Sequence, residues 1–277
     1  MIPPLPAGIG AAIAANLASK GANVVINYTS ASSSDLAAQL ATQLATTHGV
    51  RTTAVQADVG TAEGAKALVD GARALGPSDG AAASFQIDIL INNAGIALNN
   101  PLPAVTQAEF AETYRVNVLG PLLAVQAAQP YLPADRSGRI VNISSVSSSC
   151  GFVGQSVYGG TKAALEAMTR TWARELAERC TVNAVNPGPV EGPMYASNSR
   201  EFLEGIKGWI GHTPLMAARD GVDAPEVVAE ARKEINAGGR PAYVQEVAGV
   251  VGMLTGPDAA WVTGQVVCAN GGMLMLH

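Results

Sequence analysis

A tyrosine and a lysine that could move a proton stand four residues apart, in the stretch Tyr158-Gly159-Gly160-Thr161-Lys162. On a helix this spacing puts both side chains on one face, about one turn apart. A phenol ordinarily loses its proton only near pH ~10, and a neighbouring ammonium favours the phenolate and lowers that pKa. The pair therefore suits a general acid working near neutral pH, although alone it is more often a solvated contact on a helix surface.

Two other polar residues have the right types to assist such an acid. Ser145 follows an expected strand, residues 139–143, and comes shortly before Tyr158. If both elements end at the same edge of a sheet, the two hydroxyls can reach one substrate oxygen. Asn117 lies inside an expected helix, where a buried amide must find partners. The simpler interpretations are an ordinary serine-rich loop, and a helix kink or a hydrogen bond across a dimer face.

Three segments at expected strand ends suit the binding of a ligand. Asn92-Asn93-Ala94-Gly95 follows a buried strand, and its small residues allow close approach to the backbone. Asp58 and Val59 follow another strand, where the carboxylate could accept from an amine. Asn186-Pro187-Gly188-Pro189-Val190 forms an extended turn that leaves backbone groups free. The alternatives are an ordinary strand-to-loop turn for the first segment and a helix N-cap for Asp58.

Helical and strand patterns alternate along the chain. Helices are expected over residues 8–20, 34–47, 61–75, 107–128 and 156–178, and strands over 23–28, 51–56, 87–92, 139–143, 181–185 and 265–269. Residues 76–84 are expected to form a loop. Nearly continuous apolar strands between helices indicate a parallel sheet covered on both faces, the doubly wound, three-layer, Rossmann-like α/β fold. One domain is expected over residues 1–277, and residues 192–242, which lose this regularity, suit a substrate lid.

Composition excludes several classes of protein. Of 277 residues, 48% are hydrophobic and only 14% charged, so the chain can bury a large core. A net charge of −5 disfavours nucleic acid as a partner. Three scattered cysteines and three scattered histidines predict neither a disulfide framework nor a metal site. With no apolar run of membrane-spanning length and no signal peptide pattern, a cytoplasmic protein without membrane contact is expected.

Several separated motifs, in order, resemble the short-chain dehydrogenase/reductase family. They are the Asn92-Asn93-Ala94-Gly95 segment, Asn117, the Ser145/Tyr158/Lys162 triad, the Pro187-Gly188 turn, and Val262-Thr263-Gly264-Gln265 with Gly271-Gly272. The resemblance runs from about Gly8 to Met275. It implies that Tyr158 gives a proton to a carbonyl oxygen, while Ser145 positions that oxygen. It also implies that Lys162 lowers the pKa of the tyrosine and holds the nicotinamide ribose, with Asn117 holding a relay water.

The resemblance further implies a nicotinamide cofactor and its contacts. The expected cofactor-binding residues, in addition to Tyr158 and Lys162, are Gly8, Ile9, Gly10, Tyr28, Thr29, Ser30, Asp58, Val59, Asn93, Ala94, Gly95, Pro187, Gly188 and Val190. Users of NAD place an acid at the end of the second strand of this fold. Tyr28, followed by hydroxyl residues, stands there instead, which favours NADP(H) over NAD.

The beginning of the chain departs from the family. Pro3 and Pro4 stand where a threonine and the first glycine of the phosphate-binding turn are usual, and only Met1 and Ile2 precede them. Because proline cannot extend a central strand, the first strand of the sheet is expected to be missing. We interpret the chain as a truncated or mis-started form of a longer reductase. Gly192 also replaces a threonine that usually touches the carboxamide.

The expected activity is NADP(H)-dependent reduction of a small or medium ketone, or oxidation of the alcohol. The sequence resembles microbial carbonyl reductases, including those acting on oxoacyl carrier proteins and polyketides. Apolar lid residues such as Phe202 and Trp209 suit an apolar or aromatic substrate. The alternative is a non-redox descendant that binds, senses or cyclises a ligand with impaired cofactor binding. Ala-rich faces on helices 107–128 and 156–178 are expected to form a homodimer or homotetramer.

Overall fold

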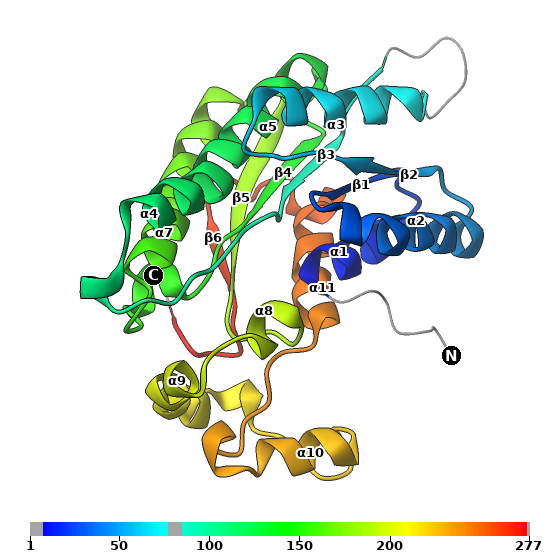
Figure 1. Ribbon diagram of the computed structural model, residues 1–277. Helices are drawn as coiled ribbons and strands as arrows, with labels where there is room; N and C mark the ends of the chain where they lie inside the picture. The colour runs from blue at the N-terminus through cyan, green and yellow to red at the C-terminus, as the bar shows by residue number, and fades with distance from the viewer. Residues whose placement is uncertain (1–7, 77–84, 276–277) are drawn as a thin grey trace.

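The computed structural model describes residues 8–76 and 85–275, and confirms the α/β fold (Figure 1). All strand pairs in it are parallel. The strands are β1 (Val24–Tyr28), β2 (Thr52–Gln56), β3 (Ile89–Asn92), β4 (Gly138–Ile143), β5 (Cys180–Pro187) and β6 (Val266–Ala269). Every residue of β4 and β5 is buried, as their apolar runs predict. These two strands form the centre of the larger sheet.

Helices cover both faces of the strands and make the outer layers. They are α1 (Ile9–Ala18), α2 (Ser34–His48), α3 (Ala62–Ala74), α4 (Gln107–Tyr114), α5 (Gly120–Ala128), α6 (Ser147–Cys150), α7 (Ser156–Glu175), α8 (Pro193–Ala196), α9 (Arg200–His212), α10 (Pro225–Ala231) and α11 (Val244–Leu254). Helices α3, α5 and α7 lie on one side of the strands, and α1, α2 and α11 on the other. None of the helices in the described residues has the length and hydropathy to span a membrane.

The strands of the described chain form two separate sheets. β1 pairs with β2, while β3, β4, β5 and β6 form the second sheet in that order. Among residues 8–76 and 85–275 no strand lies between β1 and β3, where the sequence predicts a missing element. The side chains of β1 are all only partly buried, unlike those of β4 and β5. The two facing strands therefore resemble sheet edges although helices surround them. Residues 1–7, which include Pro3 and Pro4, lie outside the described residues.

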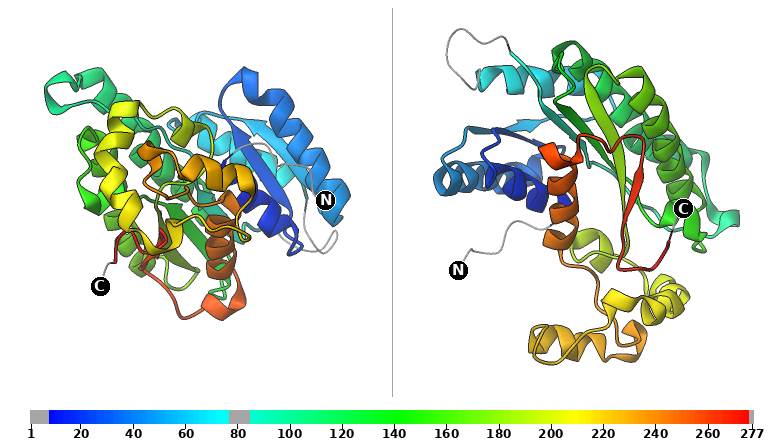
Figure 2. Two further views of the ribbon diagram at one scale, coloured as in Figure 1. Left: turned by 90° about the horizontal axis from the view of Figure 1, so that it is seen from below. Right: turned by 180° about the vertical axis from the view of Figure 1, so that it is seen from behind.

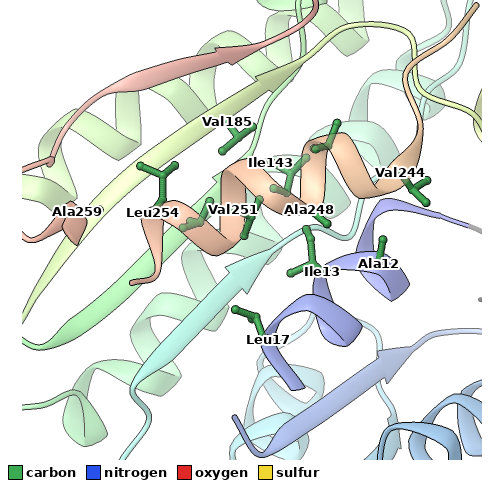
Figure 3. Close-up of a cluster of buried hydrophobic side chains, with 12 residues drawn as sticks. Ala12, Ile13, Leu17, Ile143, Val185, Val244, Ala248, Val251, Leu254 and Ala259 are labelled. Atoms are coloured by element: carbon green, nitrogen blue, oxygen red, sulfur yellow. The ribbon is translucent and has the colours of Figure 1, made fainter. Parts of the chain in front are cut away.

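Helices α1 and α11 join the two parts of the fold through an apolar cluster (Figure 3). Ile13 and Leu17 of α1 meet Val251 of α11, and α11 in turn packs on Ile143 and Val185 of the larger sheet. On its other side α1 packs against Leu40 and Leu44 of α2. Burial of apolar side chains thus holds β1 and β2 beside the larger sheet where backbone pairing is interrupted.

The helix expected over residues 107–128 is interrupted. α4 and α5 are joined by a π-helical turn, Arg115–Leu119, which contains Asn117. The α7 helix and the β5 strand occupy the places that the sequence predicts, with ends shifted by a few residues. Thr61 caps α3, accepting a hydrogen bond from the backbone N–H of Gly64 at 3.0 Å. Most of the expected loop at 76–84 falls outside the described residues.

The expectation of irregular structure over residues 192–242 is wrong. This segment forms α8, α9 and α10 with short 3₁₀ turns, and it lies below the ends of the strands (Figures 1 and 2). Glycines at 205, 208 and 211 hide the pattern of α9, whose Ile206 and Ile210 are nonetheless buried. Phe152 contacts the rings of Phe202 and Trp209, with centroid distances of 6.3 and 5.8 Å. The segment 192–242 is therefore packed near the loop that carries Ser145.

We predict uneven hydrogen exchange across the two sheets. Amide groups of β1 and β3 that face the gap have no strand partner among the described residues, whereas β4 and β5 are paired on both sides. Peptides covering β1 and β3 should exchange faster than peptides covering β4 and β5, because unpaired amides exchange without prior opening. Mass-spectrometric exchange measures this directly. Equal protection in the four strands would contradict an open gap.

Candidate active site

A cavity of about 740 Å³ opens at the carboxyl ends of the strands and extends between β1 and β3. Its walls come from α1, the segment after β3, the loop after β4, helix α7 and the lid helices. Most of the predicted site residues line it. They are Gly8, Ile9, Gly10, Tyr28, Thr29, Val59, Asn93, Ala94, Gly95, Ser145, Tyr158, Lys162, Pro187, Gly188 and Val190.

Three predicted site residues do not line this cavity: Ser30, Asp58 and Asn117. The Asp58 carboxylate binds Arg115 Nη1 at 2.8 Å and accepts from the backbone N–H of Gly60 at 2.9 Å. The N-cap of the following helix is Thr61, not Asp58. Asp58 thus ties the end of β2 to the π-helical turn, and its oxygens already have partners.

Tyr158 lies in the third position of α7 and its side chain is almost completely buried. Burial raises the pKa of its phenol, and a hydrogen bond with the Ser145 side chain lowers it in part. Burial therefore outweighs the pKa-lowering effect that the nearby ammonium predicts. At neutral pH the phenol keeps its proton and is ready to donate it.

Lys162 follows one turn later on the same face of α7 and is only 4% exposed. Its Nζ donates to the backbone oxygen of Ile143 at 2.8 Å and lies 5.6 Å from the centroid of the Tyr158 ring. Burial lowers the pKa of this ammonium to about 8, and the charge of Glu166 acts in the opposite direction. A lysine with this pKa titrates near the physiological range rather than near its ordinary value of ~10.4.

Asn117 supports the site from the π-helical turn. Its side chain is 1% exposed, and it accepts from the backbone N–H of Ile96 at 2.9 Å. Its Nδ2 donates to the backbone oxygen of Ile96 at 2.9 Å and to Thr161 Oγ1 at 3.1 Å. The amide thereby links the segment after β3 to helix α7. Wide π turns that redirect one side chain are frequent at functional sites.

Glycines let the walls of the cavity approach one another closely. A Cβ on Gly10 would lie 2.6 Å from Asn93 Nδ2, so any other residue there would force the Asn93 side chain to move. A Cβ on Gly95 would lie 3.2 Å from Asn117 Oδ1 and 3.5 Å from Lys162 Nζ. The first turn of α1 also presents its free backbone N–H groups to the cavity, as an anionic group requires.

Sequence reasoning missed a chain of three amides at the lid side of the cavity. Gln155 Nε2 donates to Asn99 Oδ1 at 2.9 Å, and Asn99 Nδ2 donates to Asn198 Oδ1 at 2.8 Å. Gln155 and Asn198 line the cavity, and Gln155 Oε1 is buried with no hydrogen-bond partner among the described residues. The signal in the sequence is slight: Gln155 stands three residues before Tyr158, at the N-cap of α7.

Comparisons with known proteins agree with this geometry. The sequence model of the family described as "short chain dehydrogenase" matches residues 5–202. The chain is 50% identical to L-xylo-3-hexulose reductase of Hypocrea jecorina (97% of this chain, 93% of the relative). It is 51% identical to L-xylulose reductase of Aspergillus niger (96% and 93%). Among solved structures, a blue fluorescent protein from a metagenomic library in complex with NADPH has a TM-score of 0.77 and 34% identity (97% and 94%).

The chain belongs to the short-chain dehydrogenase/reductase family. Its parallel α/β architecture and its relatives agree on this point, and the family resemblance of the sequence motifs is confirmed. It is therefore an oxidoreductase of that family.

We predict that Gly159→Ala destabilises the protein. A Cβ on Gly159 would lie 2.5 Å from the backbone oxygen of Ser147, which forces α7 away from α6. The free energy of unfolding should fall by about 1–3 kcal/mol, the usual cost of overpacking. Urea titration measures it. The matched control is Gly205→Ala on α9, where no atom lies within 4 Å; it should raise helix stability slightly. Equal stability of the two variants would contradict the predicted clash.

Proposed function

We propose that this protein is an NADP(H)-dependent reductase of a polyhydroxylated ketone, with Tyr158 as the general acid. The proposal depends on one observation: Ser145, Tyr158 and Lys162 line the same cavity. Gly8 and Gly10, at the N-terminus of α1, line that cavity too. Two similar reductases are each named after a ketose, L-xylo-3-hexulose or L-xylulose, and these names support a ketone as substrate.

In the proposed mechanism the Tyr158 phenol donates its proton to the carbonyl oxygen as that oxygen becomes negative. Ser145, which lines the same cavity wall and whose Oγ donates to Ser147 Oγ at 3.0 Å, would turn to donate to the same oxygen and stabilise its developing charge. Lys162 holds a positive charge behind the phenol and so favours loss of the phenolic proton. Asn117 keeps the Ile96 segment and Thr161 in register, and a water held near it would return protons to the site. In the oxidative direction the same groups act in reverse.

The residues of the cavity suit a phosphorylated nicotinamide cofactor. When bound, this cofactor supplies the hydride. At the end of β1 the cavity wall holds Tyr28 and Thr29, with no carboxylate to repel a 2′-phosphate. Lys162 and the segment Asn93–Gly95 would hold the ribose rings, and Val190 would face the carboxamide. The NADPH complex of the similar blue fluorescent protein supports the same choice.

The substrate side of the cavity has a polar and an apolar wall. Gln155, Asn198 and Ser147 offer hydrogen-bonding groups to the cavity that Tyr158 also lines, as a substrate rich in hydroxyl groups requires. Phe152, whose backbone oxygen accepts from Gln155 N–H, and Phe202 give an aromatic surface to the same cavity. The polar wall favours a sugar-like ketone over the oxoacyl thioester or aromatic substrate that the lid composition alone suggests.

A second candidate function rests on the gap between β1 and β3. This gap lies beside the place where the cofactor phosphates would bind, so a ligand-binding or cyclising role without hydride transfer is the alternative.

We further propose that α4, α5 and α7 form the faces of a homodimer or homotetramer. Exposed Phe110 and Leu119 near these helices support such a contact. A cytoplasmic location stays an expectation from the sequence.

Cofactor binding and substrate turnover test the proposal together. Fluorescence titration should show tighter binding of NADPH than of NADH, because no carboxylate at the end of β1 opposes the extra phosphate. With NADPH, ketoses such as L-xylulose should be reduced faster than apolar ketones or oxoacyl thioesters. Binding of neither cofactor would overturn the reductase and favour the alternative. A preference for NADH would refute the predicted cofactor choice alone.

We predict that Tyr158→Phe abolishes catalysis while cofactor binding remains. Loss of the proton donor should lower kcat by roughly 10²–10⁴-fold, the usual contribution of a general acid. The binding constant for NADPH should change little, because only a hydroxyl is removed. Tyr131→Phe is the matched control, since Tyr131 packs on Phe85 and lies outside the cavity. Retained turnover in Tyr158→Phe would remove this residue from the mechanism.

A further inference from the structure

Glu166 is a buried acid that the mechanism above does not use. It lies on α7 one turn after Lys162 and is 7% exposed. It does not line the cavity. Since carboxylates are rarely buried without partners, its surroundings must compensate for lost solvation.

Three donors from three different elements bind one oxygen of this carboxylate. Glu166 Oε1 accepts from Ser144 Oγ at 2.6 Å, from Ser148 Oγ at 2.8 Å and from Asn186 Nδ2 at 3.2 Å. A carboxylate oxygen can accept from several donors at once. The three bonds therefore hold the Glu166 side chain at one place between three elements.

These donors flank the functional groups of the site. Ser144 directly precedes Ser145, and Ser148 belongs to the short helix α6 that follows it. Asn186 directly precedes the Pro187-Gly188 turn at the end of β5. Because α7 also carries Tyr158 and Lys162, one carboxylate connects the ends of β4 and β5 to the helix of the proton donor.

The charge of Glu166 also acts on Lys162. Burial disfavours the Lys162 ammonium, and Glu166 is the charged group that favours it. Titratable or charged residues on the other elements packed against α7 are Glu109, Glu112, Tyr114, Arg115, Arg139, Cys150 and Cys180. Arg115 pairs with Asp58 and Glu112, and Glu109 accepts from Asn100. Arg139 donates to backbone oxygens at the opposite end of β4. None of these groups contributes to the pKa of Lys162.

We propose that Glu166 is a positioning residue of the active site. Its carboxylate keeps Lys162 in the ammonium form, and its hydrogen bonds hold the Ser145 loop and the Pro187 turn against α7. The kinetic part of this inference rests on the proposed reductase function, whereas the electrostatic part concerns the folded protein alone.

Glu166→Gln tests the inference, because it keeps the shape of the side chain and removes the charge. The pKa of Lys162 should fall by about one unit, the lower range for loss of an opposite charge at this spacing. Lysine side-chain NMR titration measures it, with the signal assigned through Lys162→Arg. Ketone reduction needs the protonated pair, so its activity falls as pH rises through this pKa. The alkaline limb of kcat should therefore move down by about one pH unit.

Glu175→Gln is the matched control, since Glu175 lies on the same helix, carries the same charge and is exposed. It should leave the pKa of Lys162 and the pH profile unchanged. An unchanged Lys162 pKa in Glu166→Gln, or an equal shift in Glu175→Gln, would overturn the inference. A loss of stability without any change in the pKa or the pH profile would reduce Glu166 to a structural role and also overturn it.

Glu166→Asp carries the test if Glu166→Gln does not fold. This variant keeps the charge, so the pKa of Lys162 should stay near the wild-type value; a fall of a full unit would contradict the inference. The proposed function can fail separately. If no ketone is reduced by any variant while Glu166→Gln shifts the Lys162 titration, the electrostatic role stands and the reductase does not. If ketones are reduced but Glu166→Gln leaves the Lys162 titration unchanged, the reductase function stands and the electrostatic role of Glu166 fails.

Discussion

The arrangement of the site depends on keeping an ammonium inside the protein. Lys162 is only 4% exposed, and burial lowers its pKa towards neutrality. In the proposed mechanism it carries its charge, because a positive charge behind Tyr158 favours transfer of the phenolic proton. The backbone oxygen of Ile143 and the carboxylate of Glu166 compensate for the lost water. The ends of β4 and β5 are thereby fixed to α7.

A second consequence is that the proposed acid and the proposed cofactor site rest on different kinds of structure. Tyr158, Lys162 and Ser145 are held by the larger sheet, in which β4 and β5 are paired on both sides. The expected adenine side rests on β1 and β2, which are held through side-chain packing of α1 on α11 and α2. Hydrogen-bonded ladders thus position the proposed catalytic residues, while an apolar contact between helices positions the outer half of the proposed cofactor site.

Much of this could be predicted from the sequence because local patterns determine it. Apolar runs identify the buried strands, and strand ends place Asn93, Ser145 and Pro187 at one edge. The π-helical turn could not be predicted, since it depends on Asn117 reaching the distant Ile96. Helix α11 was missed because its valines favour strand and its glycines disfavour helix. The direction of the pKa of Tyr158 depends on depth of burial, which spacing along a helix does not reveal.

In the described residues β1 and β3 are not paired with each other, so a bound ligand would have an additional effect on the stability of the fold. A dinucleotide that lies along the cavity would touch both sheets at once and act as a brace between them. Restraining the smaller sheet would cost free energy, so the observed affinity of the ligand would be lower than its intrinsic affinity. By linkage, a ligand that binds the native state with higher affinity would also raise the melting temperature further. Substitutions in the α1–α11 contact, far from the ligand, would therefore alter cofactor affinity without touching a single cofactor atom.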